Sequence, residues 1–261
     1  MKKIFLVLAV SIAILSCNKV AKGEFLISGT AKGIADGKTV ILEKQDDMGQ
    51  RLVPVDTVKV KGGKFEIKGK ITEPAFYTLQ IQDAQGKIPV IVENEAIKVT
   101  VDKDSIQNSK VSGSYSNDEL YKFNQEMKGV QKSVQKQSTD FQTKNMQAME
   151  AAQKIKDTVV INKLMKEFSK IQEVVTGKYL TYAESHPKSF ISVLIIDGMF
   201  KQPKVEIEKI KKMYAGLDKN LQNTKPGKSI KSNIDNFGKV SATSGISVPT
   251  PSANPNGATS K

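Results

Sequence analysis

Hydrophobic and polar residues alternate along the first part of the chain, in short runs that are separated by glycine and polar turns. This period of two is typical of half-buried antiparallel strands. The runs are EFLISGT (24–30), TVILEKQ (39–45), VDTVKVKGGKFEIKGK (55–70), AFYTLQIQ (75–82), IPVIVE (88–93) and IKVTVD (97–102). Strands at this spacing predict an antiparallel β-sandwich over residues 18–114.

Glycine and proline indicate how these strands turn and end. Gly62 and Gly63 are expected to form a tight hairpin turn, because both can adopt the positive φ that such a turn requires. Pro74 and Pro89 are expected at a strand start and at a sheet edge, where a missing N–H does least harm.

After Ser116 the apolar spacing becomes three and four residues, which is the period of an amphipathic helix. Ser116 or Asn117 is expected to cap the first helix, with Asp118 and Glu119 favourable in its first turn. Two narrow apolar stripes, separated by a break around Lys156, predict two long helices that pack as an antiparallel hairpin. The stripes are Leu120, Phe123, Met127, Val130, Val134 and Phe141, then Ile161, Leu164, Phe168, Ile171, Val175 and Tyr182.

Two short helices are predicted beyond the hairpin, at Phe190–Phe200 and Val205–Leu217, so a helical domain is expected over residues 115–240. Residues 241–261 are rich in Ser, Thr, Pro, Gly and Asn and predict a disordered tail. The fold class is therefore α+β: an N-terminal antiparallel β-sandwich, a helical hairpin with short helices, and a disordered C-terminal tail.

The first residues have the layout of a secretory signal peptide. Two lysines precede an apolar run at residues 4–15, interrupted only by Ser11, which is too short to span a membrane as a helix. The following Ile14-Leu15-Ser16-Cys17 resembles the lipobox of bacterial lipoproteins, which implies removal of residues 1–16 and lipid attachment to Cys17. The other interpretation is an ordinary signal peptide with a chance cysteine near its end.

Cys17 is the only cysteine in the sequence. Once it is lipidated, the mature chain has no free thiol, and disulfides, cysteine nucleophiles and thiolate metal sites are all excluded. We therefore expect an ordinary hydrophobic core, no cofactor, and no enzymatic activity.

The net charge of +13 is concentrated in the second half of the chain, where residues 117–261 carry 23 lysines against 14 acidic residues. All but one of the basic residues are lysine, and the chain has no tryptophan. Nucleic-acid binding proteins usually combine arginine with aromatic residues, so no nucleic-acid partner is expected. A solvated helical surface explains the lysines, and a basic face resting on anionic lipid is the alternative.

Few residues suggest catalytic or metal chemistry. His186 is the only histidine and precedes a proline at a helix end, where a structural role is expected. The carboxylate pairs Asp46-Asp47 and Glu93/Glu95 fall in predicted turns, where acidic residues are common without any function. Gly29, Gly33 and Gly37 lie between two strands, so they do not predict a phosphate-binding loop; Phe65, Phe76 and Tyr77 are expected in the sandwich core.

Several stretches resemble a known protein family: FLISGTAKGIADGKTVILEK, VDTVKVKGGKFEIKGKITEPAFYTLQI, VIVENEAIKVTVD, VSGSYSNDELYKF and YLTYAESHPKSFISVLII. With them, residues 24–240 resemble the N-terminal region of the lipid-anchored thiol-disulfide oxidoreductases of Bacteroidota. In that family a domain of unknown function and a helical segment precede a thioredoxin-like domain with a Cys-x-x-Cys motif. No such motif follows here, so the resemblance implies the fold, export and anchoring but no redox activity.

Two hypotheses for the function remain. The first is a non-catalytic envelope lipoprotein that serves binding or assembly, with the membrane and an envelope protein as partners. The second is a truncated or remnant thiol-disulfide oxidoreductase. Residues 18–19 lack the acidic run that would suggest surface export in this group, so we expect an anchor in the outer or inner membrane and a protein that faces the periplasm.

Overall fold

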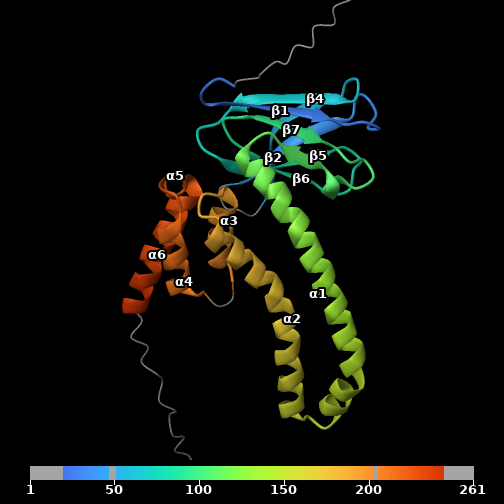
Figure 1. Ribbon diagram of the computed structural model, residues 1–261, viewed down its shortest axis with the longest axis vertical. Coiled ribbons are helices and arrows are strands. Elements are labelled where there is room, and N and C mark those ends of the chain that lie inside the picture. The colour runs from blue at the N-terminus through green and yellow to red at the C-terminus, as the bar shows by residue number, and fades with distance from the viewer. Residues whose placement is uncertain (1–19, 47–50, 203–204, 244–261) are drawn as a thin grey trace, which may run out of the picture. The chain divides into compact units, whose positions relative to one another are not determined.

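The computed structural model describes residues 20–46, 51–202 and 205–243, and the chain divides into two compact units between Thr139 and Asp140. The first unit holds all the strands and the first part of a long helix, and the second unit holds the rest of that helix and the remaining helices (Figure 1). The α+β class expected from the sequence is thereby confirmed. We call the two parts the β unit and the helical unit. The signal peptide, the lipidation site Cys17 and most of the expected tail lie outside the described residues.

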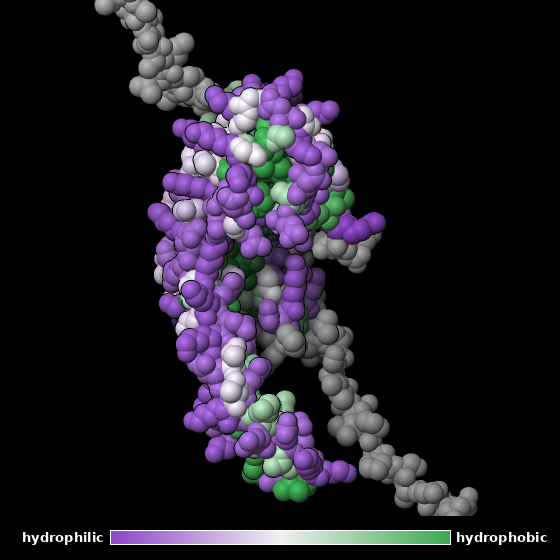
Figure 2. Space-filling model, turned by 90° about the vertical axis from the view of Figure 1, so that its right-hand side faces the viewer, coloured by the Kyte–Doolittle hydropathy of each residue, from purple (hydrophilic) through white to green (hydrophobic). Residues whose placement is uncertain are grey.

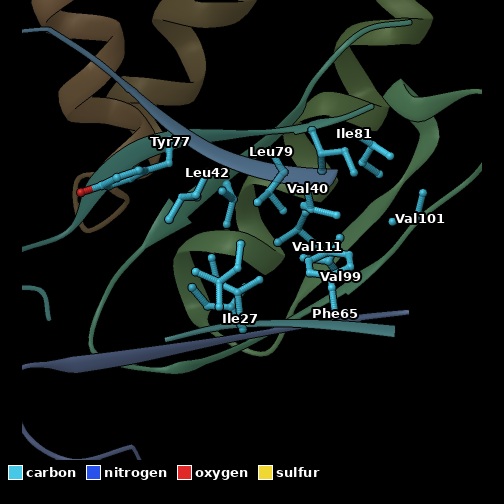
Figure 3. Packing of buried hydrophobic residues seen from close by; sticks show 14 of the residues in the cluster. Ile27, Val40, Leu42, Phe65, Tyr77, Leu79, Ile81, Val99, Val101 and Val111 are labelled. Atoms are coloured by element: carbon cyan, nitrogen blue, oxygen red, sulfur yellow. The ribbon is translucent and has the colours of Figure 1, made fainter. Parts of the chain in front are cut away.

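The β unit is a sandwich of two four-stranded sheets, in the order β4-β1-β7-β8 and β3-β2-β5-β6. Its apolar core lies between the sheets (Figure 3) and takes buried side chains from every strand except β3, which contributes the partly buried Val58. The strands are β1 (Glu24–Thr30), β2 (Thr39–Gln45), β3 (Leu52–Lys59), β4 (Lys64–Lys70), β5 (Ala75–Ile81), β6 (Ile88–Val92), β7 (Ala96–Thr100) and β8 (Lys110–Ser112).

One strand pair departs from the antiparallel arrangement that the alternation suggested. β1 and β7 run parallel, with Ile27 opposite Ile97, whereas every other pairing among the described strands is antiparallel. Parallel neighbours need a long crossover. Here β2 to β6, four of which belong to the opposite sheet, lie between β1 and β7, so the connection is long enough.

The turn at Gly62 and Gly63 is present, but it does not join a hairpin within one sheet. Both glycines have positive φ, at 56° and 66°, and Lys61 and Lys64 exchange backbone hydrogen bonds across them. The preceding strand β3 pairs with β2, and the following strand β4 pairs with β1 in the other sheet. The turn therefore carries the chain from one sheet to the other. Asp36 accepts hydrogen bonds from the N–H groups of both glycines, which lowers the pKa of its carboxyl group.

The prolines occupy the positions that their chemistry predicts. Pro74 immediately precedes β5, and Pro89 lies in β6, an edge strand. A third proline, Pro54, lies in the opposite edge strand β3, beside a shift in the register with β2. An edge strand tolerates a proline because its outer N–H groups make no ladder hydrogen bonds.

Six α-helices follow the strands in the described residues: α1 (Tyr115–Lys154), α2 (Thr158–Ser185), α3 (Phe190–Met199), α4 (Ile207–Gly216), α5 (Lys219–Gln222) and α6 (Lys225–Thr243). The break between the two long helices is confirmed, and Asp157 caps α2 by accepting hydrogen bonds from two backbone N–H groups. In the helical unit, α3 to α6 pack with the end of α2 around a second core that includes Phe190, Ile196, Ile210 and Ile230. α6 reaches Thr243, so residues 241–243 are helical, where a disordered tail was expected.

The predicted cap of α1 is wrong. The helix begins at Tyr115, and the Ser114 hydroxyl accepts from the backbone N–H of Asn117 at 3.4 Å. Asn117 lies inside the helix and is fully buried. Its side-chain amide accepts from the N–H of Ile91 at 2.9 Å and donates to the carbonyl oxygen of Ile91 at 2.7 Å. Asn117 therefore joins the start of α1 to the open side of edge strand β6.

Candidate functional site

An apolar groove lies in the helical unit, between the part of α1 that follows Asp140 and the first half of α2. Its volume is about 790 Å³. The rings of Phe141 and Phe168 meet across the hairpin, with their centroids 5.8 Å apart. The lining residues are Phe141, Gln142, Thr143, Asn145, Met146, Met149, Glu150, Leu164, Met165, Phe168 and Ser169.

The groove exists because the apolar surface of each helix is wider than the seam between them. Leu164 is buried in the seam at 6% exposure. Met146 and Met165 lie beside the seam and remain 57% and 60% exposed. A two-helix hairpin can bury one narrow stripe from each helix, so these neighbouring methionines have no third helix to cover them. An exposed apolar hollow is the result.

The chemistry of the lining favours binding over catalysis. Glu150 is the single charged residue among the lining residues, and none of them is a histidine, lysine or cysteine. General acid–base chemistry needs positioned proton donors and acceptors, which this set does not supply. Three methionines line the groove, and their unbranched, polarisable side chains adapt to differently shaped apolar partners. The groove is therefore suited to hold an apolar surface.

Two of the four carboxylates that the sequence suggested for catalysis or metal binding, those of Asp46 and Glu93, take part in local contacts. Asp46 lies 3.8 Å from Arg51 across the β2–β3 connection, and Asp47 falls outside the described residues. Glu93 accepts a hydrogen bond from the Ser116 hydroxyl at 2.9 Å. The backbone carbonyl of Glu95 accepts from Leu26 N–H. Among the described residues, no three His, Cys, Asp or Glu side chains converge as a metal site would require.

His186 takes part in the turn that joins α2 to α3. Its ring stacks on that of Tyr182, with 4.2 Å between centroids. Its backbone carbonyl accepts from Ser192 Oγ at 2.7 Å and from the N–H of Ser189, the residue that caps α3. Tyr182 Oη lies 3.1 Å from Ser189 Oγ. These contacts give His186 a structural place at the joint, which agrees with the role that its sequence context predicted.

The three aromatic residues assigned to the sandwich core do not all lie there. Phe65 and Tyr77 are buried at 6% and 9%, whereas Phe76 is 38% exposed. The prediction for Phe76 is wrong because adjacent residues of a strand point to opposite faces of the sheet, and Tyr77 takes the inner face. Gly29 belongs to β1, directly under the Phe65 ring.

The methionines of the groove were not singled out in the sequence. Met165 follows Leu164 of the second predicted stripe by one residue, and Met146 and Met149 lie beyond Phe141, where the first predicted stripe ends. The signal that identifies them is the grouping of Met146, Met149 and Met165 on the two sides of one helix–helix connection.

Residues 25–120 match the family model described as Domain of unknown function (DUF4369). The matched region covers the eight strands that the structure describes, apart from Glu24 at the start of β1, and the first residues of α1. It ends before the groove begins. No curated protein and no solved structure matches the chain. The N-terminal part is therefore similar to a family that is defined as a domain without assigned function.

Proposed function

We propose that this protein is a non-catalytic, lipid-anchored binding protein of the cell envelope, and that the groove of the helical unit holds a short amphipathic helix of a partner polypeptide. The observation that carries this proposal is the exposed, methionine-lined hollow between α1 and α2. Exposed apolar surface of this kind marks interaction sites in soluble domains.

The dimensions of the groove fit a short helix. Its lining on α1 runs from Phe141 to Glu150, and ten residues of helix extend for about 15 Å. A helix that lies along this length would present two to three turns to the groove. It would place anchoring side chains at i, i+3 or i+4, and i+7, as amphipathic helices do in apolar grooves.

The exposed rim favours a helix over a small apolar molecule. Met146 and Met165 are more than half exposed, at 57% and 60%, so a ligand in the groove keeps one side in water. An amphipathic helix can turn its polar face to that side. A wholly apolar small molecule would leave hydrocarbon exposed there, which is unfavourable.

Anchoring rests on the sequence alone, because Cys17 lies outside the described residues. No helix that the structure describes is long and apolar enough to cross a bilayer. Cys17→Ala should move the protein from the membrane fraction to the soluble fraction or block its processing. An unchanged distribution with unchanged cleavage would contradict lipid attachment.

The proposal assigns no redox step to these residues. A dithiol–disulfide cycle requires two cysteines, and the 261 residues contain one. The resemblance to thiol-disulfide oxidoreductases then concerns the shared N-terminal region and not their chemistry. The alternative is that the protein is a remnant of such an enzyme, and under that hypothesis the groove has no ligand.

Binding of a model helix tests the groove. The protein is residues 18–261, which contain every element described above. The probe is a fluorescein-labelled peptide with leucine at i, i+3, i+4 and i+7, and its binding is followed by fluorescence anisotropy. Met146→Glu and Met165→Glu should each weaken binding about tenfold or more, because a charge then faces the apolar contact.

Two controls make the result specific to the groove. Val174→Glu changes an exposed apolar residue of α2, the helix that carries Met165, at a position outside the groove, and should leave the affinity for the peptide unchanged. A scrambled peptide without an apolar stripe should not bind. If the glutamate variants bind the striped peptide as tightly as the unchanged protein does, the groove is not the binding site.

A further inference from the structure

The junction of α1 and α2 exposes apolar side chains to a degree found nowhere else among the described residues. We call residues 154–163 the hairpin tip. Ile155 is 76% exposed and Val159 is 78% exposed, the highest values for large hydrophobic residues. Figure 2 shows hydrophobic surface at the lower end of the view, where these two helices meet, with hydrophilic residues around it.

The backbone of the tip is fixed by hydrogen bonds. The end of α1 has the Schellman pattern, in which Asp157 N–H donates to the Ala152 carbonyl and Lys156 N–H to the Gln153 carbonyl. The Asp157 carboxylate accepts from the backbone N–H of Val159 at 3.0 Å. Ile155 and Val159 are thus held outward by an ordered turn.

The residue type at position 156 is unexpected for this turn. Lys156 has φ of +56°, in the left-handed region. Glycine is preferred at this position of a Schellman motif, because a side chain costs free energy there. The lysine therefore contributes nothing to the turn that glycine would not supply better. Its charge is the property that glycine lacks.

Cations surround the apolar residues of the tip. Lys154, Lys156 and Lys163 are exposed, and Asp157 is the single acidic residue in 154–163. The Asp157 carboxylate already accepts two backbone hydrogen bonds as the cap of α2. Lysine side chains can lie along an apolar surface and extend their ammonium groups to a polar boundary. The tip therefore combines a small apolar apex with a positive rim.

We propose that the hairpin tip inserts into an anionic lipid surface. Ile155 and Val159 enter the boundary of the acyl chains, and the three lysines contact the phosphate groups around them. This contact goes beyond the proposed function. It uses no residue that lines the groove and does not depend on the lipid at Cys17.

The shape and size of the apolar apex favour lipid over a protein partner. A stable protein interface buries about 800 Å² on each side, which two projecting side chains in a helix turn cannot supply. Shallow insertion into a membrane needs only a few apolar side chains together with electrostatic attraction. The charge of the rim matches that of anionic headgroups.

Vesicle sedimentation tests the contact with residues 18–261, which carry no acyl chain. The probes are vesicles of phosphatidylcholine alone and vesicles in which half of it is replaced by phosphatidylglycerol. We expect the protein to sediment with the anionic vesicles and to be released by salt. Ile155→Asp/Val159→Asp should remove binding, and Lys156→Gly should weaken it about fivefold, the factor expected for one lysine near such a surface.

Matched variants separate a local contact from general charge. Val174→Asp and Lys170→Gln change exposed residues of α2 outside the tip and should leave vesicle binding close to that of the unchanged protein. Lys156→Gly should not lower the stability of the fold, because glycine suits the left-handed position. Loss of vesicle binding with intact stability would then report the lost charge.

Tryptophan fluorescence tests insertion directly, because the chain has no tryptophan of its own. Ile155→Trp should shift its emission to shorter wavelength with the anionic vesicles, and Val174→Trp should not. If the emission of Ile155→Trp is unchanged, or both variants shift equally, the tip does not insert and the proposal is wrong. Equal binding by the aspartate variant and the unchanged protein would overturn it as well.

Discussion

The side-chain amide of the buried Asn117 pairs with the backbone of Ile91 on the open edge of β6. Asn117 satisfies both backbone groups of Ile91 that point away from β5, and its Nδ2 also donates to Ser114 Oγ at 2.9 Å. Edge strands leave such groups unpaired unless another element covers them. Asn117 supplies one acceptor and one donor at the spacing of a strand backbone, so α1 completes the edge of β6 at this position.

Asn117→Ala should lower the free energy of unfolding by roughly 2–4 kcal/mol, because it leaves one buried N–H and one buried carbonyl without partners. Urea denaturation, followed by circular dichroism, measures the change. Asn124→Ala, on a partly exposed position of the same helix, should cost far less. Equal losses from the two substitutions would show that the amide of Asn117 has no special role.

Sequence periodicity predicted the residue ranges of strands better than their partners. β1 and β2 span the ranges that the alternation indicated, 24–30 and 39–45. The sheet that each strand joins was not predictable, because the alternation only says that one face is buried. The alternation on the two sides of the Gly62-Gly63 turn therefore suggested one hairpin, although β3 and β4 belong to different sheets.

The sequence patterns did not predict β8 or α6, which are a very short strand and a helix with proline and glycine at its start. β8 has three residues, too few to show an alternation. α6 begins with Lys225, Pro226 and Gly227, and proline and glycine usually indicate a break. Pro226 is tolerated because the first turn of a helix needs no internal N–H partner, and the Thr224 hydroxyl accepts from Gly227 N–H at 3.3 Å. The groove was not predicted for another reason, since its existence depends on how much apolar surface remains exposed on either side of the contact between α1 and α2.

Two glycines should respond to alanine in opposite directions because of the elements that hold them. In β1, a Cβ at Gly29 would lie 2.0 Å from the Phe65 ring, so the strand pair β1–β4 has no room for it. In α2, a Cβ at Gly177 would meet nothing within 4 Å. Gly29→Ala should destabilise the protein by about 1–3 kcal/mol, and Gly177→Ala should stabilise it by up to about 1 kcal/mol.

Thermal and urea unfolding of both variants measure these changes. A spectroscopic probe of each unit adds information, since the loss should appear in the β unit and the gain in the helical unit. If Gly29→Ala is neutral, the Phe65 ring moves aside at little cost and the close contact does not limit the strand.

The boundary between the two units falls inside one helix. α1 has 40 residues, and Thr139 and Asp140 lie past its middle. Every member of the sandwich core lies between Phe25 and Val111. The core of the helical unit is equally local, with buried residues from Ala152 to Ile230. Separate cores can open separately even when one helix is common to both.

Phe168→Asp should therefore melt the hairpin of the helical unit and leave the β unit folded. Phe168 packs on Phe141 and lines the groove, so a charge there loses this contact and places a carboxylate against apolar neighbours. We expect a destabilisation of roughly 2 kcal/mol or more, loss of helical circular dichroism, and faster hydrogen exchange in α2. The strands of the sandwich should keep their protection.

Ile27→Asp, at a fully buried position of β1, should give the reverse pattern, with exchange increased across the sheets and α3 to α6 protected. If either substitution abolishes protection in both units together, in one cooperative transition, the two cores form a single folding unit and the division of the chain does not describe its stability.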